Sequence, residues 1–104
     1  MFARVTSSEL TPEDVETFVS MIRNQVIPRA QGLHGFEGGY WLLDRSAGRV
    51  MGVTLFESEA ALDASEAEAS RIREEASRGA GLPNPSHQRY EVVAWTGPAE
   101  APTE

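Results

Sequence analysis

The sequence contains two histidines, His34 and His87, and no cysteine. Because an imidazole titrates near neutral pH, each histidine is a candidate catalytic acid or base. His34 lies in a glycine-rich segment, and His87 follows a segment rich in proline and glycine, where it could also serve as an axial haem ligand. A surface position is the simpler interpretation of both. Two histidines this far apart, without cysteine, give a weak indication of a metal site.

Two arginines, Arg4 and Arg89, fall in segments that are predicted to be strands. A buried guanidinium needs an acceptor, which could be Glu37, Glu91 or an anionic ligand. The alternative is a position at the rim or edge of the sheet, where water solvates the charge.

Four apolar side chains are candidates to line a pocket: Phe18, Ile22, Trp41 and Tyr90. Phe18 and Ile22 lie on the apolar side of a predicted helix, and all four residues would also suit an ordinary core. Tyr40 and Trp41 point to opposite faces of one predicted strand. One of these two should therefore face the core or pocket of its own chain, and the other a partner subunit.

Six predicted elements position these side chains, in the order β-α-β-β-α-β. Hydrophobic patterning predicts strands over residues 2–7, 36–44, 49–56 and 88–96, and helices over residues 12–27 and 59–79. Residues 36–56 carry two aromatic and β-branched runs around a short polar segment that ends in glycine, as in a β-hairpin. This order is typical of the α+β ferredoxin-like fold, an antiparallel four-stranded sheet with two helices on one face.

Both predicted helices carry a capping residue and one apolar stripe. Thr11 and Ser58 can cap the first turns, whereas Pro28 and Gly79 are expected to end the helices near those positions. The first stripe comprises Val15, Phe18, Val19, Ile22 and Val26, and the second comprises Leu62, Ser65, Ala69, Ile72 and Ala76. The opposite face of the second helix, which includes Asp63 and Glu66, is acidic and is interpreted as a solvated surface without a recognisable acid/base pair.

The two hairpin strands are apolar on both faces. Strict alternation puts Phe36, Tyr40 and Leu42 on one face, and Trp41 and Leu43 on the other. Such weak amphipathicity indicates a sheet that is covered on both sides. Since one layer of helices covers one face, the other face should meet a second subunit or a ligand.

The composition favours one small acidic domain, expected over residues 1–96, followed by a disordered tail over residues 97–104. The chain has 104 residues and a formal charge of −7, and its nine basic residues are all arginine. Acidic proteins gain nothing from counterion release, so nucleic acid and anionic membranes are not expected as partners. No segment has the pattern of a signal peptide or a membrane span, so we expect a cytoplasmic location.

Residues 54–62 (TLFESEAAL) and residues 35–41 (GFEGGYW) resemble two motifs of one known family. They are similar to the strand-to-helix junction and the second strand of antibiotic biosynthesis monooxygenases, in the dimeric α+β barrel group. Family members commonly have tryptophan where this chain has Phe56. The resemblance implies a homodimer with two sheets packed face to face, and a pocket between the sheet and the helices of each subunit.

The same resemblance implies two kinds of activity, which are oxygenation of quinol-like aromatics without a bound cofactor and haem degradation. Haem-degrading members use an asparagine on the first strand, and a tryptophan and a histidine on the second helix. The corresponding helix positions fall near Ser65 and Glu75, and the first strand has no asparagine. Haem degradation by that mechanism is therefore not expected.

Three functions stay open from the sequence. The first is a cofactor-independent monooxygenase of a hydrophobic aromatic substrate. The second is a non-catalytic module that binds a small apolar ligand. The third is a structural dimerisation domain whose pocket is filled by its own side chains.

Overall fold

Four antiparallel strands form one sheet in the order β2-β3-β1-β4, in a computed structural model that describes residues 1–96. The strands are β1 (Phe2–Glu9), β2 (Phe36–Asp44), β3 (Arg49–Phe56) and β4 (Ser86–Glu91). In the centre of the sheet, Arg4 of β1 is paired with Thr54 of β3 on one side and Arg89 of β4 on the other. This topology confirms the predicted α+β ferredoxin-like fold.

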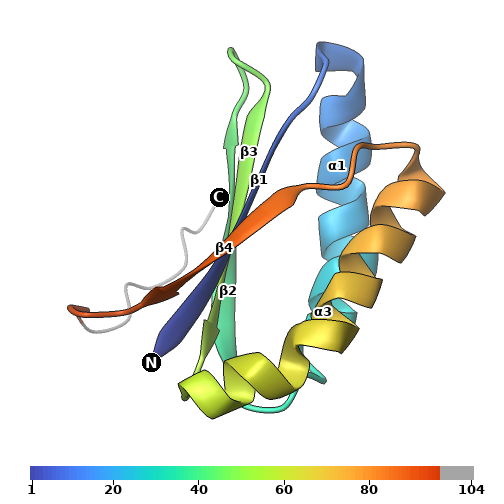
Figure 1. Cartoon of the computed structure of the whole chain (residues 1–104). Coiled ribbons are helices and arrows are strands. Elements are labelled where there is room, and N and C mark those ends of the chain that lie inside the picture. Colours follow the sequence, from blue (N-terminus) through green and yellow to red (C-terminus); the bar gives the residue numbers. More distant parts are fainter. Residues whose placement is uncertain (97–104) are drawn as a thin grey trace.

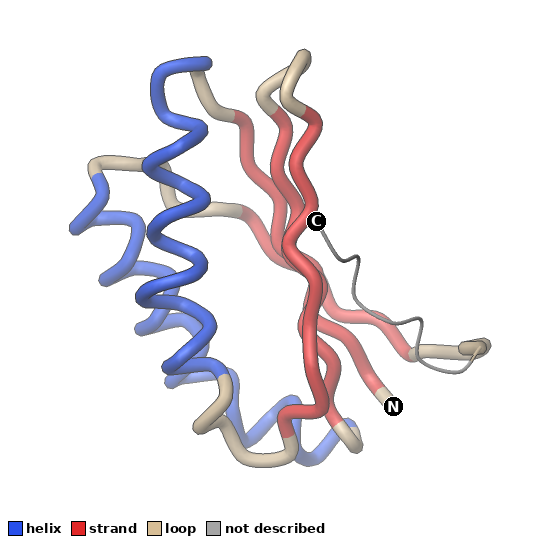
Figure 2. Tube along the Cα trace, turned by 180° about the vertical axis from the view of Figure 1, so that it is seen from behind, coloured by secondary structure: helices blue, strands red, loops and turns tan. Residues whose placement is uncertain are grey.

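Two helical segments pack against one face of the sheet (Figure 1). The first is a continuous run of the 3₁₀ turn η1 (Pro12–Asp14), α1 (Val15–Met21), the π-helical turn η2 (Ile22–Val26) and α2 (Ile27–Ala30). The second is α3 (Glu59–Ala80). Seen from behind, the helices lie on one side of the strands, and no described element covers the other side (Figure 2).

The first helical segment continues past Pro28, so the predicted end near residue 27 is wrong. Proline lacks an N–H group, and its ring crowds the carbonyl four residues earlier. In η2, which precedes it, the N–H of Ile27 bonds instead to the carbonyl of Ile22, five residues back. This wider turn accommodates the proline, and the helix ends at Ala30.

The start of α3 agrees with its predicted cap, whereas the start of the first segment does not. The Ser58 hydroxyl oxygen accepts a hydrogen bond from the N–H of Ala61 at 3.0 Å. The Thr11 hydroxyl instead donates to the Asp14 carboxylate at 3.0 Å and caps no N–H group. A 3₁₀ turn, rather than an α-helical turn, therefore opens that segment.

The predicted apolar stripe of α3 is buried at all five positions: Leu62, Ser65, Ala69, Ile72 and Ala76. The helix passes through Gly79 and stops at Gly81, whose φ of 71° is left-handed. The predicted stop at Gly79 is therefore two residues too early.

A β-bulge at the start of β2 places Phe36 on the helix side of the sheet, so its predicted grouping with Tyr40 and Leu42 is wrong. The register between β2 and β3 shifts between Phe36 and Gly38, and Gly38 has a φ of 140°. A bulge adds one residue to a strand and reverses the faces beyond it. The Phe36 ring consequently meets the Phe56 ring edge to face, with 5.9 Å between centroids.

The last strand is shorter and begins earlier than predicted. It spans Ser86–Glu91, and the residues from Val92 to Thr96 belong to no strand, although the N–H of Val92 donates to the carbonyl of Met1 at 2.9 Å. Val93 and Trp95 in that stretch are 88% and 58% exposed. The expected tail over residues 97–104 lies outside the described residues.

Within residues 1–96, none of the helices has the length and apolar character that crossing a membrane requires.

Candidate functional site

A cavity of about 80 Å³ lies between the helix side of the sheet and the two helical segments. Its wall is mostly apolar, and its aromatic members are Phe18 of α1 and Trp41 of β2. From the same helical segment, Ile22 and Val26 of η2 also line the cavity, together with Met21 of α1 and Ala30 of α2. The π-helical turn thus faces the cavity, in keeping with the frequent occurrence of such turns at functional sites.

Two glycines make room for Trp41 on the floor of the cavity. A Cβ atom on Gly52 would lie 2.9 Å from the indole nitrogen of Trp41, and one on Gly39 would lie 3.2 Å from its ring. Contacts this short would force the indole to move. The absence of these two side chains therefore lets the tryptophan lie close against the main chain of the sheet.

Arg4 on the central strand supplies a buried positive charge to the same cavity. Its side chain is 2% exposed and lines the cavity. One terminal nitrogen, Nη2, donates to the carbonyl of Leu62 and the hydroxyl of Ser65 at 3.2 Å, and to the Glu66 carboxylate at 2.8 Å. The guanidinium also lies over the Phe56 ring, 5.1 Å from its centroid. These contacts hold the charge in a fixed position.

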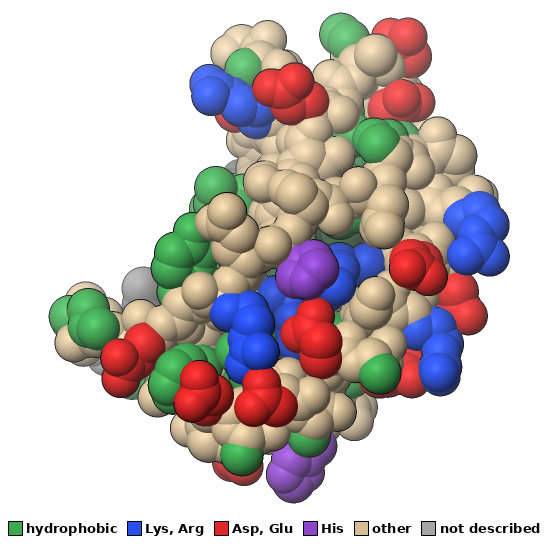
Figure 3. Space-filling view, viewed as in Figure 1, with side chains coloured by type: hydrophobic (Ala, Val, Ile, Leu, Met, Phe, Trp, Pro, Cys, Tyr) green, Lys and Arg blue, Asp and Glu red, His purple; other side chains and the backbone are tan. Residues whose placement is uncertain are grey.

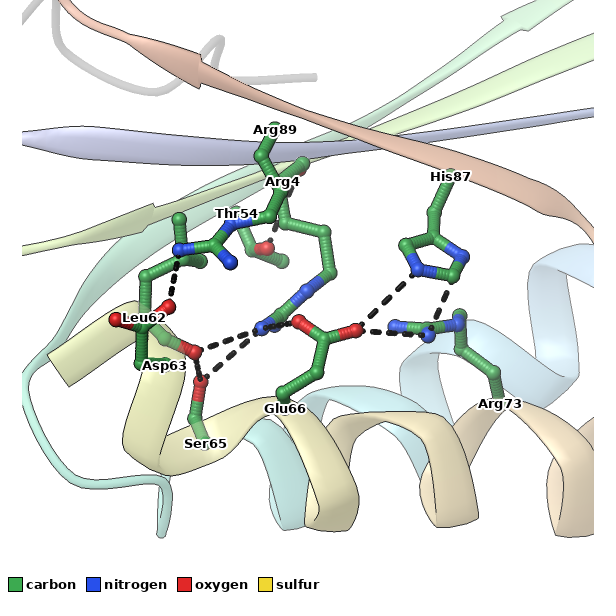
Figure 4. A network of polar contacts seen from close by, with 9 residues as sticks. All are labelled: Arg4, Thr54, Leu62, Asp63, Ser65, Glu66, Arg73, His87 and Arg89. Atoms are coloured by element: carbon green, nitrogen blue, oxygen red, sulfur yellow. Dashed lines mark hydrogen bonds and ion pairs between the residues drawn. The ribbon is translucent and has the colours of Figure 1, made fainter. Parts of the chain in front are cut away.

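Glu66 is the point at which three basic side chains meet (Figure 4). Besides its bond to Arg4, its carboxylate lies 3.3 Å from Nε2 of His87 and 3.8 Å from a terminal nitrogen of Arg73. Partial burial acts to raise the pKa of Glu66, but the hydrogen bond and charge of Arg4, with His87 and Arg73, outweigh it and lower that pKa. The carboxylate is therefore ionised at neutral pH.

Arg73 of α3 lines the cavity beside Arg4, and its side chain is 11% exposed. Burial, followed by the charge of Arg4, lowers the pKa of Arg73 against the opposing effect of Glu66 and Glu74. A second ion pair, between Arg89 and Asp63, flanks this group on the same side of the sheet. Figure 3 shows acidic, basic and histidine side chains gathered in the middle of one face of the molecule.

The structure brings together three of the four candidate pocket residues. Phe18, Ile22 and Trp41 line the cavity, whereas Tyr90 lies on the other face of the sheet. Strand alternation explains the difference, because Tyr90 is the neighbour of Arg89, which points toward α3. Tyr90 is half exposed, and its hydroxyl donates to the Gln88 side chain.

The two histidines lie in different surroundings. His87 on β4 lies next to Glu66 and Arg73, and its Nδ1 is 3.5 Å from a terminal nitrogen of Arg73. His34 is exposed in the loop that joins α2 to β2. His87 is therefore the histidine with acid/base partners.

Sequence reasoning missed Glu66 and Arg73 and named other partners for the arginines. Glu37 and Glu91 are not the partners of Arg4 and Arg89, which pair with Glu66 and Asp63. Both carboxylates lie on the helix face that the sequence predicts to be solvated, and the prediction of a merely solvated face is wrong at these two positions, because each carboxylate pairs with an arginine of the sheet. Glu66 follows the buried Ser65 directly, and Arg73 lies seven residues later on the same side of the helix. This spacing is the sequence feature that could have placed both residues beside the buried face of the helix.

The arrangement offers general acid/base chemistry at His87 and charge stabilisation by two guanidinium groups beside an apolar chamber. Within residues 1–96, no three side chains of the types His, Cys, Asp and Glu are grouped to hold a metal ion.

The outer face of the sheet is apolar and accessible. Tyr40, Leu42 and Met51 are 53%, 52% and 41% exposed, and Val5, Val53 and Leu55 between them are half-buried. Contiguous apolar patches of this kind on proteins are typical of interaction surfaces.

Solved structures with the same fold include monooxygenases. A Streptomyces coelicolor monooxygenase in complex with the ligand nanaomycin D has a TM-score of 0.69 at 18% identity, over 94% of this chain and 92% of that chain. A Bordetella bronchiseptica protein assigned as an antibiotic biosynthesis monooxygenase has a TM-score of 0.67 at 17% identity, over 89% and 97%. A Nitrosomonas europaea protein of unknown function has a TM-score of 0.70 at 17% identity, over 94% of each chain. The chain thus has the fold of antibiotic biosynthesis monooxygenase-like proteins.

Sequence comparison finds uncharacterised relatives. Two Mycobacterium tuberculosis proteins, from strains CDC 1551 and H37Rv, are 29% identical over 94 residues. The match covers 90% of this chain and 42% of each relative, so the chain spans about two fifths of their length. No protein-family model matches the sequence.

Proposed function

We propose that the cavity binds a small apolar aromatic molecule, and that the protein oxygenates this molecule without a bound cofactor. The observation that carries the proposal is the apolar cavity walled by Phe18 and Trp41, with an acid/base group beside it. The shared fold with a monooxygenase that binds a small molecule supports it.

His87 is the proposed catalytic base, with Glu66 to stabilise its protonated form. In a reaction of this class, a phenol-type substrate first loses its hydroxyl proton, and the electron-rich anion then reduces O₂. One oxygen atom becomes a new carbonyl on the ring, and the other leaves as water with the hydroxyl and ring hydrogens. The substrate supplies all the electrons, so the equation balances without a further reductant. A neutral imidazole within reach of the hydroxyl would accept the proton.

A non-catalytic role is the second candidate, and the size of the cavity favours it. The volume of about 80 Å³ is smaller than the roughly 150 Å³ of an engineered protein cavity that holds benzene. An aromatic substrate therefore requires side chains such as Phe18 to move. In a ligand-binding module the movement would occur without turnover, and in a purely structural dimerisation domain it would not occur.

The proposed assembly is a homodimer in which the outer faces of two sheets pack together. The exposed patch around Tyr40 and Leu42 would then be buried, and each sheet would be covered on both sides, as the sequence predicts. Val93 and Trp95, which project beyond β4, would extend the contact. The cytoplasmic location and the single domain over residues 1–96 stay predictions.

The test of catalysis is oxygen consumption with a panel of hydroxylated aromatics, including anthrones and naphthols. We expect His87→Ala to abolish turnover, because the variant lacks the base, and His34→Ala to retain it, because His34 is remote and exposed. Circular dichroism would check that both variants fold. Turnover at the wild-type rate in both variants would exclude histidine catalysis.

The same panel separates the remaining alternatives. A rise in melting temperature with an aromatic compound, without oxygen uptake, would favour a binding module. No change in melting temperature with any compound would favour a filled, structural domain.

A further inference from the structure

The polar side of the cavity carries more positive than negative charge, although the chain as a whole has a formal charge of −7. Two guanidinium groups, Arg4 and Arg73, line the cavity, and His87 lies beside them. The carboxylate that faces them is that of Glu66, while Asp63 is paired with Arg89. Glu74 also acts on Arg73 from the next turn of α3. Among the described residues, the Glu66 carboxylate is thus shared by two arginines and a histidine.

Arg4 has unused hydrogen-bonding capacity. Its Nε is buried and has no hydrogen-bond partner within residues 1–96, while Nη2 makes three bonds. A buried donor without an acceptor is destabilising, because it has given up its hydrogen bonds to water. An unpartnered donor on a cation that is 2% exposed indicates a place for a further acceptor.

Arg73 is also weakly satisfied. Its terminal nitrogen Nη2 lies 3.8 Å from the Glu66 carboxylate, which exceeds hydrogen-bonding distance, and 3.5 Å from Nδ1 of His87, which is at the outer limit of that distance. A guanidinium carries five N–H donors in a planar fork that matches a carboxylate. Within the part of the chain that the structure describes, Arg73 therefore has donors left for an anion in the cavity.

We propose that the natural ligand of this cavity is an apolar molecule that carries a carboxylate, and that Arg73 and the Nε of Arg4 bind this carboxylate. The inference rests on the proposed ligand site and specifies its substrate class. The apolar body of the ligand would lie against Trp41 and Phe18, which line the same cavity. Glu66 already shows that a carboxylate is stable next to these arginines.

The test compares acids with their neutral amides by isothermal titration calorimetry. The probes are benzoate against benzamide, and 2-naphthoate against 2-naphthamide, which differ in charge but hardly in shape. We expect each acid to bind at least about tenfold more tightly than its amide, as is usual for hydrogen bonds to charged groups. Equal affinities would overturn the carboxylate inference and leave the proposed aromatic site intact. Absence of binding by all four probes would overturn both.

Variants locate the effect. Arg73→Gln should bring the acid-to-amide ratio close to one without weakening the amide. Arg71→Gln, which removes an equal charge from an exposed position on the same helix, should keep the ratio. If the ratio survives in Arg73→Gln, the acid binds elsewhere and the inference is wrong.

Glu66→Gln provides an independent check if Arg73→Gln does not fold. Because it removes the competing carboxylate, it should raise the affinity for 2-naphthoate several-fold and leave that for 2-naphthamide unchanged. An unchanged affinity for the acid in this variant would contradict the proposed contact.

Discussion

Both faces of the sheet carry apolar residues, but the helices bury those on one face, whereas those on the outer face are accessible to solvent. On the helix side, Phe56 is fully buried against Phe36, and even the charge of Arg4 has partners within the chain. On the outer side, Tyr40 and Leu42 are about half exposed. Apolar residues on both faces of a strand predict two covered faces, and residues 1–96 supply the cover for one of them.

The largest expected effect comes from the helix side. Phe56→Ala should lower the free energy of unfolding by about 3–5 kcal/mol, because it opens a cavity beneath Arg4 and Phe36. Urea unfolding would show this loss equally at low and high protein concentration. The matched outer variant Leu42→Ala should cause a smaller loss that changes with concentration, as expected for a residue at a subunit contact. Equal losses of unfolding free energy in the two variants, independent of protein concentration, would contradict the proposed difference between the two faces.

The proposed dimer predicts the next largest effect. Tyr40→Asp would bury an unpaired carboxylate between subunits and should weaken the dimer on the order of 100-fold, which analytical ultracentrifugation would detect. Trp41→Asp, one residue along, faces the cavity and should lower stability at every concentration. A stable dimer of the Tyr40→Asp variant would place the subunit contact elsewhere.

Gly52→Ala tests the floor of the cavity. The added methyl group would lie 2.7 Å from the Thr6 hydroxyl oxygen and 2.9 Å from the Trp41 indole nitrogen. We expect a loss of about 1–3 kcal/mol in the free energy of unfolding, typical of overpacking, and weaker binding of aromatic probes. Gly79→Ala is the control, because its Cβ would meet no atom within 4 Å and alanine favours the helix. If Gly52→Ala is as stable as the wild type or more stable, the Trp41 indole can shift to make room for the methyl group.

Glu66→Gln is expected to have a smaller effect, about 1 kcal/mol. Removal of one partner of a fully buried pair costs more, but Glu66 is 36% exposed and glutamine keeps an acceptor for Arg4. Glu68→Gln, from an exposed pair with Arg71, should cost less still.

The stability difference between wild type and Glu66→Gln should depend on pH. Because the pKa of Glu66 is lowered in the folded state, its stabilising contribution is complete above its ordinary value of 4.5 and is lost as the pH falls through the lowered value. Unfolding measured from pH 7 to pH 3 should therefore bring wild type and Glu66→Gln closer together. Parallel curves would show that the ion pair with Arg4 contributes nothing.

Local signals in the sequence predicted most of the fold. The Ser58 cap, the buried stripe of α3 and the hairpin depend on residues close together in the chain, and all three are observed. The errors also have local causes. Proline usually ends a helix, but a π-helical turn accommodates Pro28. The bulge that turns Phe36 toward the helices lies at a pair of glycines, and strict alternation did not predict it.

The candidate site was less predictable because its contacts span the chain. Arg4 and Glu66 are 62 residues apart, and helical periodicity alone does not show which strand residue lies opposite Glu66. The need of a buried arginine for an acceptor was evident from the sequence, but the identity of the acceptor depended on the packing of α3 over β1. His87 entered the same group through the pairing of β4 with β1.

The burial of Arg4 also bears on how fast a ligand reaches the cavity. The molecule is negative overall, yet its interior holds a positive charge, so a carboxylate in solution is repelled until it has passed the surface. Added salt screens the distant repulsion more than the short contact inside. An acid should therefore associate faster as the ionic strength rises, which is the reverse of ordinary electrostatic steering, while its neutral amide should associate at the same rate throughout.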